Sequence, residues 1–151
     1  EPKAFCEASF YVKRSQYRWT RVVLAQDIAK EVALSSDIGA LLAVKVVKRG
    51  ASGHIGQLLL KGTKGEFRLD KEYQIRKLMG IGMLRSAAFV FEPVYEKGRP
   101  VEYIISGGGW GHGVGFCQSG SSGRATAGQK YNEILEHYFP GTALMDLRKI
   151  R

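Results

Sequence analysis

The sequence predicts an α+β fold of antiparallel β-hairpins with a few short helices and a glycine-rich loop that leads from a strand into a helix. Two observations predict it. Short runs with the two-residue alternation of strands are separated by glycine-containing turns, and the segments between them have the apolar spacing of helices. At 151 residues the chain has the length of one domain with a hydrophobic core, so a single domain over residues 1–151 is expected.

The first half of the chain is expected to contain a strand, a helix and a three-stranded β-meander. Residues 17–24 (YRWTRVVL) suit a strand, and residues 25–33 (AQDIAKEVA) carry apolar residues at helical spacing. Strand-like runs follow over residues 41–49, 54–62 and 66–70, with the turn residues GASG and TKG between them.

A second helix and a hairpin are expected next. Asp70 is predicted to cap a helix over residues 71–80 that ends at Gly80. Residues 87–96 and 100–106 are predicted to pair through the turn Lys97-Gly98-Arg99 and to deliver the chain into the glycine-rich stretch. The apolar side of the helix is expected to consist of Tyr73, Ile75, Leu78 and Met79.

The stretch GGGWGHGVGFCQSG, residues 107–120, alternates glycine with larger residues. If the preceding strand continues to Gly115, its two-residue period puts Trp110, His112 and Val114 on one face and bare backbone on the other. Because glycine loses the most conformational freedom on folding, the alternation requires a special backbone conformation or a close neighbour. We expect tight packing against neighbouring backbone, with these glycines in structural roles: Gly109, Gly111, Gly113 and Gly115.

Three side chains of this stretch are candidate ligand-binding residues. Trp110 has a flat apolar face that can stack on a sugar ring, or it can fill the core. His112 can donate and accept hydrogen bonds at a ligand, or it can be a buried histidine that holds the loop. Gln118 can bind an amide group of a ligand, or it can satisfy backbone at the start of the following helix.

The remaining polar residues give weaker signals. His54 has no evident partner, and His137 lies on a predicted helix over residues 131–139, where a structural or surface role is expected. Cys6 and Cys117 lack metal-site spacing and are expected to be buried or half-buried thiols. The sequence predicts no metal and no cofactor. Basic residues along the meander suggest one solvated face or a platform for an anionic polymer: Lys45, Lys48, Arg49, Lys61, Lys64 and Arg68.

The charge balance indicates the kind of partner. The chain has 23 Lys and Arg against 14 Asp and Glu, a net charge of +9, which favours nucleic acid, an anionic cell-wall polymer or a membrane surface. No apolar run is long enough to cross a bilayer. No helix-turn-helix, RNP or zinc-finger pattern occurs, so a nucleic-acid partner is not favoured.

The sequence resembles the SpoIID/LytB family, which comprises stage II sporulation protein D and the amidase enhancers. The family's signature has the form GWGHGVGMSQYGA or GWGHGVGLCQxGA followed by sYxEILxHYYPG, and this chain has GWGHGVGFCQSG followed by AGQKYNEILEHYFPGT. The YRWT strand, the hairpin of residues 38–53 and the segment of residues 62–80 are also similar to the family. Ser119 and Ser121 depart from its pattern.

The resemblance implies an extracytoplasmic domain that acts on peptidoglycan glycan strands. Its leading form is the C-terminal part of a lytic transglycosylase, and the alternative is a non-catalytic glycan-binding or amidase-enhancing module that works with other cell-wall enzymes. A nucleic-acid-binding domain is a second alternative. The family's catalytic Glu lies in a segment of the type EALKAQAVAARTY, which this sequence lacks, so no catalytic residue is assigned and truncation is expected.

Overall fold

The computed structural model describes residues 4–149, which divide into two compact units. We call Arg18–Gly113 the sheet unit, and the described residues before and after it the helical unit. The single domain expected over residues 1–151 stays a prediction.

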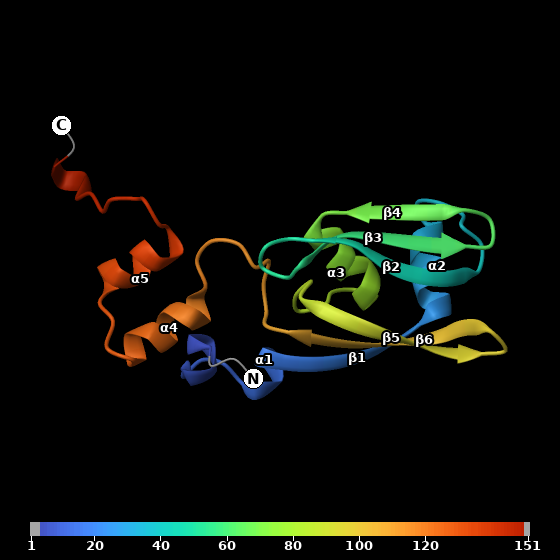
Figure 1. Cartoon of the computed structure of the whole chain (residues 1–151), viewed down its shortest axis with the longest axis horizontal. Helices are drawn as coiled ribbons and strands as arrows, with labels where there is room; N and C mark the ends of the chain where they lie inside the picture. The colour runs from blue at the N-terminus through green and yellow to red at the C-terminus, as the bar shows by residue number, and fades with distance from the viewer. Residues whose placement is uncertain (1–3, 150–151) are drawn as a thin grey trace. The chain divides into compact units, whose positions relative to one another are not determined.

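The sheet unit contains two three-stranded antiparallel sheets (Figure 1). One sheet has the order β1 (Arg18–Leu24), β6 (Arg99–Gly108), β5 (Phe89–Glu96). The other has the order β2 (Leu41–Arg49), β3 (Ile55–Gly62), β4 (Glu66–Asp70). The predicted meander and hairpin are therefore confirmed, and the fold is α+β.

The core of the sheet unit joins both sheets to two helices. Leu58 and Leu60 of β3 alternate inward and are fully buried, and they share one cluster with Ile105 of β6. The helices α2 (Ala25–Ala33) and α3 (Glu72–Gly80) add their apolar sides to the same cluster. Burying apolar surface from water is the main force that holds such elements together, at roughly 25 cal/mol per Å².

The start of α3 differs from the expectation. Asp70 pairs with Gln57 as the last residue of β4, and the N-cap position is Lys71, which has a φ of 74° and makes no side-chain cap. The prediction that Asp70 caps the helix is wrong because strand pairing holds this residue. Tyr73 is 61 % exposed, since it lies two positions before buried Ile75 and so on nearly the opposite side of the helix.

The β5–β6 turn shows why the hairpin was recognisable. Lys97 and Gly98 connect the strands with φ angles of 47° and 77°. Two-residue turns with both φ angles positive match the twist of paired strands, and glycine adopts this conformation without steric cost.

Tyr103 of β6 gives the sheet unit a pH dependence that can be measured. Burial, and secondarily the nearby Tyr95, raise the pKa of Tyr103 to about 12, although a hydrogen bond with the backbone of Val44 opposes the shift. In the unfolded chain the phenol ionises near pH 10. Stability is therefore expected to fall between pH 10 and pH 12, because the unfolded state loses the proton first. Melting temperatures of Tyr103→Phe should decline less over this interval than those of the unchanged protein, and identical declines would contradict the assignment.

The helical unit is built from short helices. The 3-10 helices are η1 (Phe5–Ala8) and η2 (Leu147–Lys149), and the α-helices are α1 (Arg14–Tyr17), α4 (Gln118–Thr126) and α5 (Tyr131–Tyr138). The last α-helix was predicted and ends one residue earlier than expected. No helix within residues 4–149 has the length and apolar character needed to cross a membrane.

The cysteines and His137 lie in this unit. Cys6 is half-buried, as expected, whereas Cys117 is exposed, contrary to the expectation. Cys117 caps α4, where its Sγ accepts a hydrogen bond from the Gly120 N–H at 3.3 Å. His137 is exposed, and its Nε2 lies 2.7 Å from Nη2 of Arg124. A guanidinium only donates, so this Nε2 accepts.

Candidate functional site

The glycine-rich stretch begins where β6 ends. The strand stops at Gly108, and residues 109–117 form a loop that contains one isolated bridge between Ser86 and Gly111. The strand does not continue to Gly115, so the condition for placing Trp110, His112 and Val114 on one strand face is not met. The physical reason is the backbone: all four alternating glycines have positive φ, which an extended strand excludes. The φ angles are 73° at Gly109, 129° at Gly111, 72° at Gly113 and 68° at Gly115.

The positive φ angles also explain why glycine occupies these positions. A β-carbon built on Gly109 or Gly111 would have no neighbour within 4 Å, so close packing is not why glycine occupies these positions. Gly113 is different, because a β-carbon there would overlap the ring of His54. The expected packing against neighbouring backbone is therefore wrong: the loop needs glycine for its left-handed conformation, and at Gly113 also for the His54 ring.

Three hydrogen bonds, one with β1 and two with the adjacent residues Arg85 and Ser86, hold the loop and the end of β6 in place. The indole Nε1 of Trp19 in β1 donates to the carbonyl of Gly109 at 3.0 Å. The buried Ser86 donates through Oγ to the carbonyl of Gly108 at 2.7 Å, and the N–H of Gly111 donates to the carbonyl of Arg85 at 2.9 Å. The loop is thus fixed to the end of the sheet rather than left free.

His54 supports the loop from the other sheet. It lies directly before β3, and its Nδ1 is 3.1 Å from Oγ of Ser52. Its ring occupies the space beside Gly113. Sequence reasoning gave this histidine no partner, because its two neighbours belong to a turn and to a distant loop. His54 and Gly113 are far apart in the sequence, and no local pattern links them, so only the folded structure reveals their contact.

Trp110 is presented to solvent by this anchored loop. The residue is 67 % exposed, and the guanidinium carbon of Arg85 lies 5.7 Å from its ring centroid. Core packing of Trp110 is therefore excluded. His112 is also exposed, so it is not the buried histidine of the alternative interpretation. Both side chains are accessible on the same short loop of the sheet unit, as a ligand-binding role requires.

Gln118 belongs to the helical unit, where it is exposed and begins α4. Its carbonyl accepts a hydrogen bond from Oγ of Ser121 at 2.8 Å. The side-chain cap of this helix comes from Cys117 instead. A ligand-binding role for Gln118 together with Trp110 and His112 stays a prediction.

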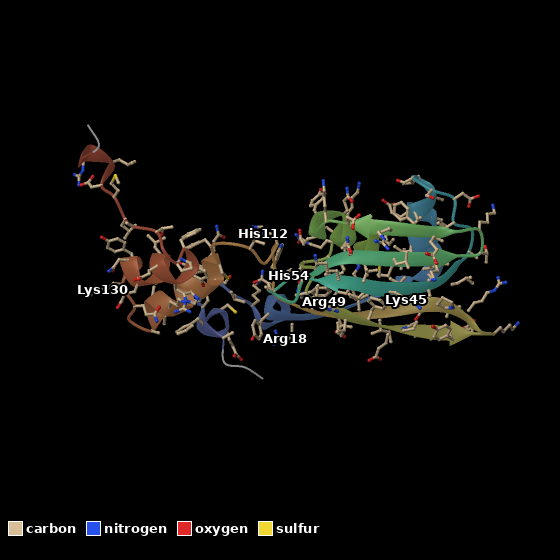
Figure 2. All side chains as sticks on the ribbon, turned by 45° about the horizontal axis from the view of Figure 1, so that its top comes forward. Arg18, Lys45, Arg49, His54, His112 and Lys130 are labelled. Carbon is tan, nitrogen blue, oxygen red and sulfur yellow. The ribbon has the colours of Figure 1, made fainter. Side chains whose placement is uncertain are left out.

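The basic residues of the meander do not form one face. Lys45, Lys61 and Arg68 share the outer face of the sheet, as the strand register shows. Arg49 instead donates to the carbonyls of Gly53 and Phe89, both at 2.8 Å. Figure 2 shows Arg18, Arg49, His54 and His112 toward the same end of the two sheets, with Lys45 further along β2. Lys64 lies in the turn before β4 and pairs with Asp37.

This end of the sheet unit offers aromatic, imidazole and guanidinium groups to a ligand. These groups bind through stacking, hydrogen bonds and positive charge. Residues 4–149 contain no group of three or more His, Cys, Asp and Glu side chains arranged to hold a metal ion.

Residues 7–115 match a family that is described as a domain of unknown function (DUF8618), and they make up well over half of the 151 residues. The chain belongs to this family. The match includes both sheets and the loop as far as Gly115.

Two relatives are similar to parts of the chain. The amidase enhancer of Bacillus subtilis (strain 168) is 38% identical over 87 residues, a match of 56% of this chain and 12% of that protein. An uncharacterized protein of Brachyspira hyodysenteriae is 45% identical over 47 residues, which are 31% of this chain and 13% of that protein. The first match agrees with the resemblance to the amidase-enhancer group, and both relatives are several times longer than the region that they share with the chain.

Proposed function

We propose that this chain is a cell-wall domain that holds peptidoglycan glycan strands at the loop of Trp110 and His112. The observation that carries the proposal is the presentation of Trp110, which is 67 % exposed on a loop fixed by hydrogen bonds at Gly108, Gly109 and Gly111. A rigid, accessible indole suits the C–H face of a sugar ring, and an adjacent imidazole can bond its hydroxyl or amide groups. The similarity to an amidase enhancer supports a cell-wall ligand.

Two activities of a whole protein would use such a domain. A lytic transglycosylase would hold the strand for cleavage, and an amidase enhancer would hold it for a partner enzyme. Cleavage requires an acid that protonates the glycosidic oxygen. The pocket beside the loop is lined by arginines, aromatic groups and hydroxyls, with no carboxylate among its residues. Glycan binding is therefore the activity that the described residues support best, and an extracytoplasmic location follows from the proposed ligand.

Binding to purified peptidoglycan tests the proposal. The unchanged chain should sediment with insoluble peptidoglycan, and Trp110→Ala should weaken the binding about tenfold, a loss of roughly 1.4 kcal/mol. His112→Ala should weaken it in the same direction. Tyr95→Ala is the matched control, because Tyr95 is a similarly exposed aromatic residue (56 %) on β5 outside the loop.

The same preparation separates the alternatives. Release of anhydro-muramyl sugars by the purified chain would show that it contains its own catalytic acid. A DNA gel shift at physiological salt that exceeds the binding to peptidoglycan would favour the nucleic-acid alternative. Equal sedimentation of Trp110→Ala, Tyr95→Ala and the unchanged chain would reject the role of the loop.

A further inference from the structure

A second binding feature lies beside the anchored loop, within the sheet unit. A pocket of about 500 Å³ opens where β1, β5 and β6 lie side by side. This volume is within the range of small-molecule sites. It is lined by residues of the adjacent strands β1, β6 and β5, by the last residue of β2 and by the β2–β3 turn. We call it the arginine pocket, and it includes Arg18, Trp19, Thr20, Arg49, Phe89 and Ser106.

Arg49 is held at this pocket in a defined position. Nη1 donates to the carbonyl of Gly53 and Nη2 donates to the carbonyl of Phe89, so the guanidinium is tied to the β2–β3 turn and to β5. A guanidinium has five N–H donors, and these two bonds leave three. Arg49 is exposed and forms no ion pair with any carboxylate of residues 4–149. The remaining donors are therefore available to a ligand.

The lining of the pocket sets the charge of that ligand. Arg18 is a second guanidinium at the pocket, and no acidic residue lines it. A planar guanidinium binds the paired oxygens of a carboxylate or phosphate with two parallel hydrogen bonds, which a neutral hydroxyl cannot match. The pocket is thus suited to an oxyanion.

The other lining groups point to a sugar that carries the oxyanion. Trp19 and Phe89, which both lie opposite Gly107, belong to the core side of the sheet, and Phe89 is 2 % exposed, so their rings do not form an open wall. Thr20 and Ser106, which lie opposite each other in β1 and β6, supply hydroxyl groups. Hydroxyl groups beside a fixed guanidinium can bond both the hydroxyls and the charge of an acidic saccharide.

The pocket and the loop are physically continuous. Trp19 lines the pocket and also donates to the carbonyl of Gly109. Gly53 lines the pocket and directly precedes His54, whose ring packs beside Gly113. We infer that the arginine pocket binds the carboxylate or phosphate group of an acidic saccharide, next to the sugar surface of Trp110. This inference rests on the proposed saccharide function and adds the charge of the ligand to it.

NMR titration of the indole N–H of Trp19 tests the inference with simple sugars. The probes are D-glucuronate for a carboxylate, D-glucose 6-phosphate for a phosphate, and D-glucose as the uncharged control. We expect at least one acidic sugar to shift the Trp19 signal at concentrations about tenfold below those needed for glucose, and Arg49→Gln to remove this preference. Arg68→Gln, on the outer face of β4, is the control for general loss of positive charge and should keep it.

Each outcome decides the matter. A response to only one acidic sugar assigns the carboxylate or the phosphate. Equal responses to glucose and both acidic sugars overturn the inference, as does an equal loss in Arg49→Gln and Arg68→Gln. If Arg49→Gln fails to fold, Arg49→Lys keeps the charge without the planar fork and should show a reduced preference. Peptidoglycan binding without any acidic-sugar preference would overturn the pocket alone, whereas an acidic-sugar preference without peptidoglycan binding would overturn the proposed ligand of the loop.

Discussion

Replacing Gly113 by alanine is expected to destabilise the sheet unit by on the order of 3 kcal/mol, because two costs coincide at this residue. Gly113 has a φ of 72°, a conformation that alanine adopts only with strain. The added β-carbon would also overlap the ring of His54, which would have to leave its contact with Ser52. For a unit of this size the loss corresponds to a fall in melting temperature of roughly 12–24 °C.

Gly109→Ala is the matched control for the backbone cost alone. Gly109 has nearly the same φ, 73°, but a β-carbon there meets nothing within 4 Å. Its substitution should cost about 1–2 kcal/mol. In the double variant Gly113→Ala/His54→Ala, removal of the ring should recover about 1 kcal/mol or more relative to additivity. Equal costs at Gly113 and Gly109, or strict additivity with His54→Ala, would show that the contact with the ring has no energetic weight.

Most of the fold was accessible to sequence reasoning because its signals are local. The alternation in residues 41–49 and 66–70 predicted β2 and β4 with their observed bounds, and residues 25–33 did so for α2. In these segments the spacing of the apolar residues and the packing in the core favour the same secondary structure. The prediction for Asp70 failed because a local preference competes with strand pairing. The residue type suits a helix cap, but the pairing of Asp70 with Gln57 of β3 keeps it in the strand.

The site was predictable only in part, because its supporting contacts join distant residues. The alternation of glycine showed that residues 109–115 have an unusual backbone. The sequence left ligand binding and packing open for Trp110 and His112, and their exposure in the structure excludes the packing alternative. A glycine in the sequence is compatible both with a positive φ angle and with a close neighbour, and the sequence does not distinguish the two. Close packing was therefore expected for glycines whose actual requirement is a positive φ angle. Likewise, the contacts of Trp19 with Gly109 and of Arg49 with Phe89 connect residues far apart in sequence, which no periodicity reveals.

In the helical unit, Gly123→Ala is expected to be destabilising by on the order of 3 kcal/mol, although alanine is the better helix former. Inside an exposed helix the change would stabilise by about 1 kcal/mol. Gly123 is a buried residue of α4, however, and a β-carbon on it would overlap the backbone carbonyl of Phe5 in η1. Backbone cannot rotate away as a side chain does, so η1 and α4 would have to separate. That separation would also remove the Arg124 guanidinium from the Phe5 ring, whose centroid lies 4.3 Å from the guanidinium carbon.

The matched control is Ser122→Ala, which improves helix propensity by up to about 0.7 kcal/mol at the neighbouring position of α4. NMR spectra of Gly123→Ala should lose the dispersed signals of the helical unit while those of β1 to β6 persist, because the substitution affects only contacts within the helical unit. Ser122→Ala should keep both sets of signals. A rise in stability for Gly123→Ala comparable to the helix-propensity gain would mean that η1 does not pack against α4 in solution. In that case the glycine would have no structural role in the unit.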